Sequence, residues 1–161
     1  MTSPSTPNKT MPNLNPAYIK RLKSFAKTSL FSRHMNLELV HIQLDQARIR
    51  LILHPHHLQP FGIVHGGVLA TLIDMATFWS AFLRLPQGTG LVNLDLKLNY
   101  LVPATKGQLM AKGHCLKSGG TIQVARASVV DSQGGLIAHG TSTLMALAGK
   151  GPSLGVNKFL P

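Results

Sequence analysis

The chain has 161 residues, of which 44% are hydrophobic and only 13% are charged. This composition fits one ordered domain with a sizeable core and argues against a disordered chain. No apolar run reaches the roughly 18 residues of a membrane span. The N-terminus lacks the hydrophobic stretch of a signal peptide, so a cytoplasmic protein without a membrane partner is expected. The single cysteine, Cys115, excludes an intrachain disulfide and a cysteine-rich metal cage.

The formal net charge of +11 at pH 7 raises the question of a polyanionic partner. Basic residues are concentrated in residues 1–34, which contain no acid, and the other basic residues are scattered singly. No aromatic residues alternate with them in the way that single-strand binding requires, so nucleic-acid binding is not expected. A surface that attracts a phosphorylated small molecule explains the same charge. For the first segment, an organellar presequence and a plain surface helix are alternatives, and the helix is preferred.

The N-terminal part of the chain changes its pattern twice. Residues 1–13 are rich in Pro, Ser, Thr and Asn, and are expected to be disordered. Over residues 16–30, Tyr18, Leu22, Phe25 and Leu30 recur at helical spacing, which predicts a helix. After Arg33 the period becomes two, which predicts two strands joined near residues 45–46.

A long apolar helix over residues 68–83 is predicted next, followed by four strands at residues 91–101, 107–116, 121–131 and 135–146. Short turns join these strands, so they should be antiparallel neighbours. The domain is expected to span residues 14–148, and residues 149–161 to form a C-terminal tail. Helices and an antiparallel sheet in this order predict an α+β fold with the helix lying on one face of the sheet.

The predicted central helix is apolar on every side, which is typical of a buried helix. Asp74 is its only charge before Arg84. Burial of this carboxylate would raise its pKa, unless it bonds a buried backbone group, pairs with a base or faces water in a groove. Gly66 and Gly67 precede the helix and leave its first N–H groups unshielded, which suits a developing oxyanion. Close packing alone would also explain the two glycines.

These residues resemble a known family. Gln-Pro-Phe-Gly-x-x-His-Gly-Gly, from Gln59 to Gly67, followed by an acid nine residues after His65, is similar to the hotdog-fold acyl-CoA thioesterases. The likeness is to the phenylacetate-pathway (PaaI-like) branch and covers about residues 35–147. It implies an antiparallel sheet wrapped around one long central helix, here with an additional N-terminal helix. It also implies hydrolysis of a CoA thioester, with an aryl or medium-chain acyl group, to a free acid and CoA.

The resemblance implies a role for each matching position. Gln59 and the Gly67 N–H would hold the thioester carbonyl, and His65 would support the loop and help the leaving thiolate. Asp74 would act as general base on water, or as nucleophile through a transient anhydride. Asn93 stands where relatives often place Ser or Thr to position that water.

Further positions are expected to bind substrate. Gly66, Phe61 and Phe78 would border the acyl and carbonyl region, although Phe78 replaces a small hydroxyl residue of some relatives. The hairpin Lys117-Ser118-Gly119 would approach the nucleotide end of CoA. Relatives often have Arg after that glycine, whereas Gly120 follows here.

Helix geometry predicts that two chains share the site. The seven residues from Gly67 to Asp74 span about 10 Å of helix, whereas a general base must lie within roughly 3 Å of its proton or one water away. A second chain would have to supply the acid, so a homodimer, or a homotetramer built as a dimer of dimers, is expected.

No cofactor or metal is expected, because the substrate is itself the CoA thioester. His54, His56 and His57 form a histidine-rich loop without nearby carboxylates, so exposed loop histidines are preferred to a metal site. Two other functions remain as alternatives: a non-catalytic acyl-CoA-binding hotdog protein, and a hotdog hydratase or dehydratase. Asp74 argues against the first, and the lack of a matching catalytic-loop histidine argues against the second.

Overall fold

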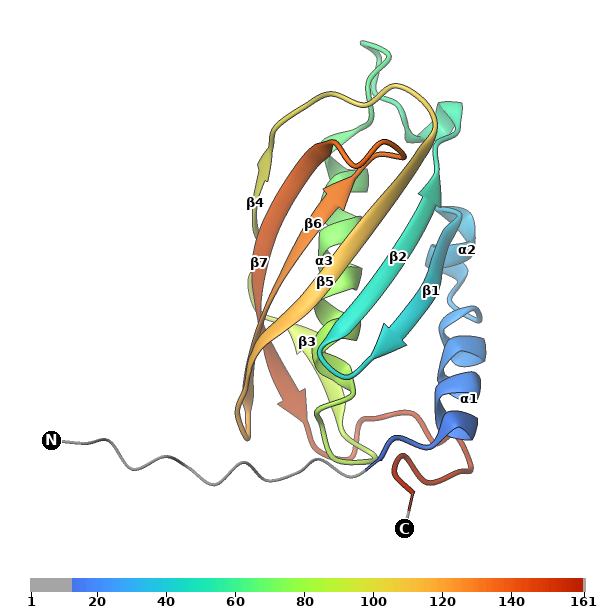
Figure 1. The fold of residues 1–161 in the computed structure, drawn as a ribbon, viewed down its shortest axis with the longest axis vertical. Coiled ribbons are helices and arrows are strands. Elements are labelled where there is room, and N and C mark those ends of the chain that lie inside the picture. The colour runs from blue at the N-terminus through green and yellow to red at the C-terminus, as the bar shows by residue number, and fades with distance from the viewer. Residues whose placement is uncertain (1–12, 161) are drawn as a thin grey trace, which may run out of the picture.

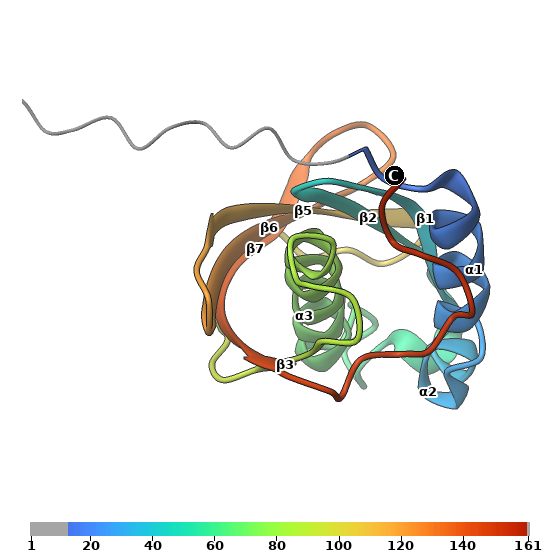
Figure 2. The same cartoon turned by 90° about the horizontal axis from the view of Figure 1, so that it is seen from below.

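The computed structural model describes residues 13–160, and its sheet is built entirely from antiparallel pairs. The strands are β1 (Leu37–Gln43), β2 (Gln46–Ile52), β3 (Gly90–Asn93), β4 (Lys97–Tyr100), β5 (Gln108–Ser118), β6 (Ile122–Val130) and β7 (Leu136–Leu147). Their order in the sheet is β1-β2-β5-β6-β7-β3, and β4 also pairs with β7. The sheet curls around one long helix, α3 (Gly66–Phe82), as Figure 1 shows from the side and Figure 2 along the helix. The predicted α+β hotdog architecture is confirmed.

Helix α3 is buried because it is apolar on every side, as its sequence predicts. Leu72, Ile73 and Ala76 are fully buried against the sheet. The hydroxyls inside this core are satisfied within the helix: Thr77 Oγ1 donates to the Ile73 carbonyl at 3.0 Å, and Ser80 Oγ donates to the Thr77 carbonyl at 2.8 Å. Asp74 is the one ionisable residue in the α3 sequence.

The N-terminal helix predicted over residues 16–30 is shorter than expected. The structure has α1 (Pro16–Ala26) and a separate short helix α2 (Leu30–His34). The second helix starts afresh because the Ser29 side chain caps it, accepting a hydrogen bond from Ser32 N at 3.2 Å. Both helices lie to one side of α3 (Figure 2). The disorder predicted for the N-terminus falls on residues 1–12, outside the described residues, and on Asn13.

The single strand predicted over residues 91–101, as a neighbour of the strand over residues 107–116, is wrong: two short strands, β3 and β4, take its place, and both pair with β7. The chain leaves the sheet between β3 and β4, at residues 94–96, because Asp95 takes over the bonding there. Its carboxylate accepts from Thr143 N at 2.9 Å, and its carbonyl accepts from Ser142 Oγ at 2.7 Å. The bonds to Asp95 thus interrupt the regular backbone hydrogen bonding to β7, and the chain bends there between the two short strands.

The C-terminal segment predicted as a tail packs on the domain over its described part, residues 149–160. The Lys158 carbonyl accepts from Asn15 N at 2.9 Å, and Leu160 N donates to Asn13 O at 2.8 Å. Lys158 is only 1% exposed, and its ammonium donates to the carbonyls of Phe82 and Leu85 at the end of α3. The segment therefore joins α1 to the C-terminal end of the central helix.

Candidate active site

The N-terminus of α3 is capped by a histidine. His65 Nδ1 accepts a hydrogen bond from the Gly67 N–H at 2.9 Å, so this donor already has a partner. The Gly66 N–H, by contrast, finds no acceptor within residues 13–160. Tyr100 lies against Gly66, and its hydroxyl donates to the Gly66 carbonyl at 3.2 Å. A side chain at position 66 would meet the Tyr100 ring, since an added Cβ would lie 3.0 Å from the Tyr100 oxygen.

A hollow of about 470 Å³ opens at this end of the helix. It is lined by Gln59, Ile63, Val64, Gly66, Leu69, Tyr100, Leu101, Val102 and Pro103. The walls are largely apolar, and the Gln59 amide and the Gly66 N–H are the hydrogen-bonding groups that distinguish them. A small apolar hollow with one or two fixed donors is suited to holding a carbonyl group. We call it the donor hollow.

Asp74 lies in the middle of α3 and is half-buried. Asn93 Nδ2 donates to Asp74 Oδ1 at 2.5 Å, so β3 orients the carboxylate. Burial raises the pKa of Asp74 above its ordinary value, and the hydrogen bond from Asn93 partly offsets that rise. The side-chain oxygen of Asn93 is buried and has no hydrogen-bond partner among the described residues.

A second hollow, of about 330 Å³, contains Asp74 and is lined mainly by aromatic and small residues. Its lining residues are Phe25, Ala26, Thr28, Ser29, Phe31, Ser32, Asp74, Met75, Phe78 and Trp79. Helices α1 and α2 form one wall and α3 forms the other. The rings of Phe78 and Trp79 meet edge to face, with centroids 5.0 Å apart. We call it the acid hollow.

The donor hollow and the acid hollow share no residue. Within one chain, the structure therefore does not bring Gln59 or Gly66 together with Asp74, as the helical separation predicted. It does bring Asp74 together with Asn93 and Phe78. Phe61 lies outside both linings and is 87% exposed.

The predicted nucleotide-binding hairpin lies at the end of β5 and lines neither hollow. Gly119 N donates to the Ile122 carbonyl at 2.9 Å, which closes the turn, and Gln123 Nε2 donates to the Gly119 carbonyl. Lys117 and Ser118 are exposed beside it.

Several lining residues escaped the sequence analysis. Phe25 belongs to the helix predicted over residues 16–30, and Phe31 was given no role; nothing in their spacing indicates that they face Asp74. For Tyr100 the sequence gives a weak indication. It is the last of the apolar residues that alternate with polar residues from Leu94 onward, and such an apolar face is expected to pack against another part of the protein. Contacts between segments so distant in sequence depend on how the strands and helices are placed, which spacing alone does not give.

The histidine-rich loop forms a structural turn. His57 is fully buried, and its Nδ1 accepts from His54 N at 3.0 Å. The ring of His56 meets that of His57 edge to face, with centroids 4.1 Å apart. Within residues 13–160, no group of three or more His, Cys, Asp or Glu side chains is arranged to hold a metal ion.

The chain is similar to known thioesterases. Residues 61–138 match the family model described as the thioesterase superfamily. Human acyl-coenzyme A thioesterase 13 is 28% identical over 125 residues, which cover 76% of this chain and 89% of the relative.

Two solved structures have the same fold. A thioesterase family protein from Silicibacter pomeroyi superimposes with a TM-score of 0.74 at 25% identity, covering 83% of this chain and 99% of that one. A thioesterase from Haemophilus influenzae shares the fold with a TM-score of 0.77 at 24% identity, covering 86% and 96% of the two chains.

A sheet curled around one buried helix, with a glycine pair at the helix start and a half-buried acid inside it, defines a hotdog-fold thioester hydrolase. Over residues 61–138 the chain is thus similar to the thioesterase superfamily. Its place in the phenylacetate-pathway branch stays a prediction. Helices α1 and α2, which wall the acid hollow, lie outside the matched residues.

Proposed function

We propose that the protein is an acyl-CoA thioesterase whose reaction centre is assembled from two copies of the chain. Asp74 is the observation that carries the proposal. It is a half-buried carboxylate with a raised pKa, it is oriented by Asn93, and it opens on an aromatic hollow. A structural acid in such a place would normally be paired with a base, and within residues 13–160 Asp74 forms no salt bridge. A carboxylate with these properties suits proton abstraction.

The proposed roles follow from the two hollows. The donor hollow of one copy holds the thioester carbonyl through the Gly66 N–H and the Gln59 amide. The Gly67 N–H, to which the resemblance gives that role, is bonded to His65 here and would become free only if the His65 ring rotated. The acid hollow of the other copy supplies Asp74, with the attacking water held beside its carboxylate.

The proposed reaction is hydrolysis of the thioester bond. Asp74 accepts a proton as the water oxygen attacks the carbonyl carbon, and the charge that develops on the carbonyl oxygen is stabilised by the donor hollow. Collapse of the tetrahedral intermediate breaks the carbon–sulfur bond, and the thiolate takes up a proton. The products are a free acid and CoA.

The exposed edge of the sheet supports a paired assembly. Strand β3 has a neighbour on one side only, and Val92 and Leu94 beside that edge are 39% and 54% exposed. An open, apolar edge strand is suited to pairing with another chain. A two-fold arrangement would give two equal reaction centres per dimer.

The acid hollow also supports the acyl class. Phe25, Phe31 and Phe78 offer aromatic surface, and a volume of about 330 Å³ suits an aryl or medium-length acyl group. Met75 adds an adaptable apolar contact on the same side of α3.

The decisive experiment is a thiol-release assay with purified protein and a panel of phenylacetyl-, benzoyl- and medium-chain acyl-CoA. The parent should release CoA, and Asp74→Asn should lower kcat by roughly 10²- to 10⁴-fold, which is the range for loss of a general base. No release from any of these substrates, or full activity in the variant, would reject the proposal.

Thermal unfolding provides the control for folding. The raised pKa of Asp74 means that its ionised form opposes folding at neutral pH, and this cost is absent when the group is protonated. Asp74→Asn should therefore unfold at a higher temperature than the parent at pH 7, and the difference should shrink as the pH falls towards 4. Lost activity in a stabilised variant points to chemistry and not to misfolding.

A further inference from the structure

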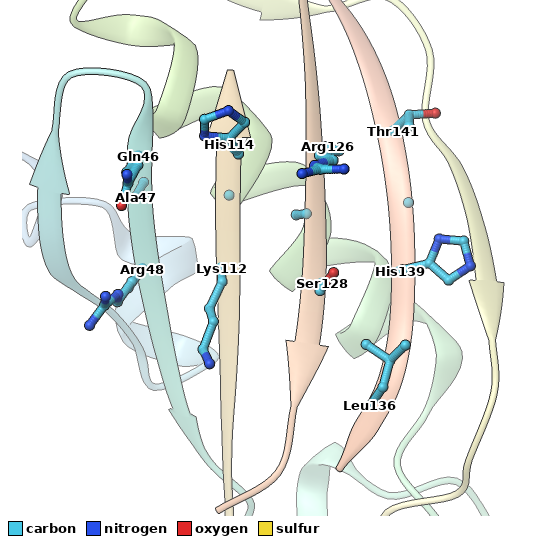
Figure 3. Close-up of a pocket in the computed structure, with 13 residues that line it drawn as sticks. Gln46, Ala47, Arg48, Lys112, His114, Arg126, Ser128, Leu136, His139 and Thr141 are labelled. Carbon is cyan, nitrogen blue, oxygen red and sulfur yellow. The ribbon is translucent and has the colours of Figure 1, made fainter. Parts of the chain in front are cut away.

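The face of the sheet that points away from α3 is basic and hollowed. Alternation along the strands turns four basic or imidazole-bearing positions of β2, β5 and β6 outward: Arg48, Lys112, His114 and Arg126. Gln46, Ser128, His139 and Thr141 join them, and Figure 3 shows these side chains on four adjacent strands. We call this surface the outer sheet face.

Strand register aligns these side chains in two neighbouring rows. Arg48 pairs with Lys112, Lys112 with Ser128, and Ser128 with His139. The next row runs through Gln46, His114, Arg126 and Thr141 in the same way. Because paired residues on one face lie about 5 Å apart, the rows form a fixed array of hydrogen-bond donors.

The floor of this array is backbone. Ala47, Gly113, Ala127 and Gly140 form the row between these two rows and face the core, so a hollow of about 600 Å³ remains on the outside between the longer side chains. At Gly113 an added Cβ would lie 2.0 Å from the Ala76 carbonyl oxygen, so the packing of α3 restricts this inward-facing position to glycine.

No acid neutralises the outer sheet face. The chain has five carboxylate side chains. Glu38 pairs with Arg50 and Lys27, and Asp45 pairs with Arg84. Asp74 lies in the acid hollow, Asp95 accepts from Thr143 N, and Asp131 accepts from N–H groups of its own turn. Arg48, Lys112 and Arg126 therefore have no salt-bridge partner within residues 13–160.

We propose that the outer sheet face binds a small molecule that carries two or more phosphate groups. Arginine guanidinium groups and a lysine provide charge-assisted contacts to phosphate oxygens, and the Ser128 and Thr141 hydroxyls add neutral donors. The volume fits a nucleotide-sized ligand. The ligand could be a free nucleoside polyphosphate or the nucleotide end of CoA, which share this chemistry.

Two other occupants fit less well. A second copy of the chain would bring the same cations face to face, with no free carboxylate on either side. Single-stranded nucleic acid binds on Phe, Tyr or Trp platforms, and no such residue lines this hollow.

The test is calorimetric titration of the full-length protein with tripolyphosphate, ATP and CoA. At least one of the three should bind, with an affinity that falls as salt rises. Arg48→Gln/Arg126→Gln should weaken that binding about ten-fold or more, as expected for the loss of two charge-assisted contacts. Lys20→Gln/Lys106→Gln removes the same charge from exposed positions elsewhere and should leave the affinity within about two-fold.

Two further measurements distinguish a free nucleoside polyphosphate from CoA as the ligand, and distinguish phosphate binding at the outer sheet face from the proposed hydrolysis. Competition between ATP and CoA shows whether they use one site. Asp74→Asn should bind the phosphate probes as the parent does, so this site does not depend on the proposed hydrolysis. Absence of binding, equal weakening in both double variants, or tighter binding of an RNA oligomer than of tripolyphosphate to this face would overturn the proposal.

Discussion

Asn93 controls the electrostatics of Asp74. Its amide donates to the carboxylate at 2.5 Å and favours the ionised form, whereas burial favours the neutral form. The two effects oppose each other, so the protonation of the proposed base depends on one hydrogen bond.

Replacing Asn93 should therefore move the pH dependence of the reaction. In Asn93→Ala the pKa of Asp74 rises further, because the stabilising donor is lost, and the acidic limb of the kcat profile shifts to higher pH. Asn93→Ser keeps a hydroxyl donor and should shift the limb less. Initial rates from pH 4 to 8 measure this effect, and an acidic limb that stays in place in Asn93→Ala would contradict the assigned role.

At the scale of elements, the contact between α3 and β5 sets the packing of the core. Gly113 lies in β5 where the helix backbone passes closest, and the limiting atom is the Ala76 carbonyl oxygen. Backbone cannot move aside as a flexible side chain can, so this position is restricted to glycine.

A matched pair of glycine substitutions checks this packing. Gly113→Ala should lower the free energy of unfolding by roughly 1–3 kcal/mol or more, which is the range for overpacking a core. Gly120→Ala, in the β5–β6 hairpin, meets no atom within 4 Å and should change stability little. Urea unfolding of both variants measures the two changes in the free energy of unfolding. Equal changes would show that the lower flexibility of alanine in the unfolded chain, and not the contact with α3, decides the effect of Gly113→Ala.

The C-terminal segment is held to α3 by a buried lysine. The Lys158 ammonium lies over the Phe82 ring, 5.1 Å from its centroid, and donates to carbonyls at the helix end, where the helix dipole is negative. Burial lowers the pKa of Lys158 from 10.5 to about 8. The segment is thus fixed by a group that loses its proton in mildly alkaline solution.

This shift predicts a pH-dependent stability. Between pH 8 and 10.5 the unfolded chain keeps a proton on Lys158 that the folded chain has released, so the free energy of unfolding rises with pH. Relative to Lys158→Met, the parent should gain up to about 3 kcal/mol across that window. Urea unfolding of both proteins at several pH values gives the difference between their free energies of unfolding. The contributions of the other titrating groups are the same in both proteins and cancel in this difference. Parallel curves for the two proteins would contradict the assignment.

At the scale of the whole molecule, the two halves of the proposed centre lie in separate hollows of one chain. The sheet has an open edge at β3, and backbone hydrogen bonds join Asn13 and Asn15 to Leu160 and Lys158. None of the helices in residues 13–160 combines the length and apolar character that crossing a membrane requires. The cytoplasmic setting predicted from the sequence remains a prediction.

Complementation between inactive variants tests the shared centre. Gln59→Ala damages the donor hollow and Asp74→Asn damages the acid hollow, so each homodimer should be nearly inactive. A heterodimer purified through two different tags has one centre with both parts intact, and should recover about half of the parent activity. A heterodimer no more active than its two parents would mean that each chain uses its own residues.

The sequence by itself determined the local features of this protein. Periodicity predicted a buried central helix and most of the strands, because these depend on which side chains must leave water, and the short turns predicted that the strands are antiparallel. The motif from Gln59 to Gly67 carried the family assignment, and helix rise alone separated Gly67 from Asp74.

Only the tertiary structure decided which distant segments meet. It placed Phe25 and Phe31 against Asp74, brought Asn93 to the carboxylate, bonded Gly67 to His65 and left Gly66 free. It also split residues 91–101 at Asp95 and buried Lys158 under α3. These features share a physical reason. Most are contacts between segments far apart in the chain, and the bond from the Gly67 N–H to His65 depends on which acceptor reaches that donor first. Local periodicity encodes neither kind of feature.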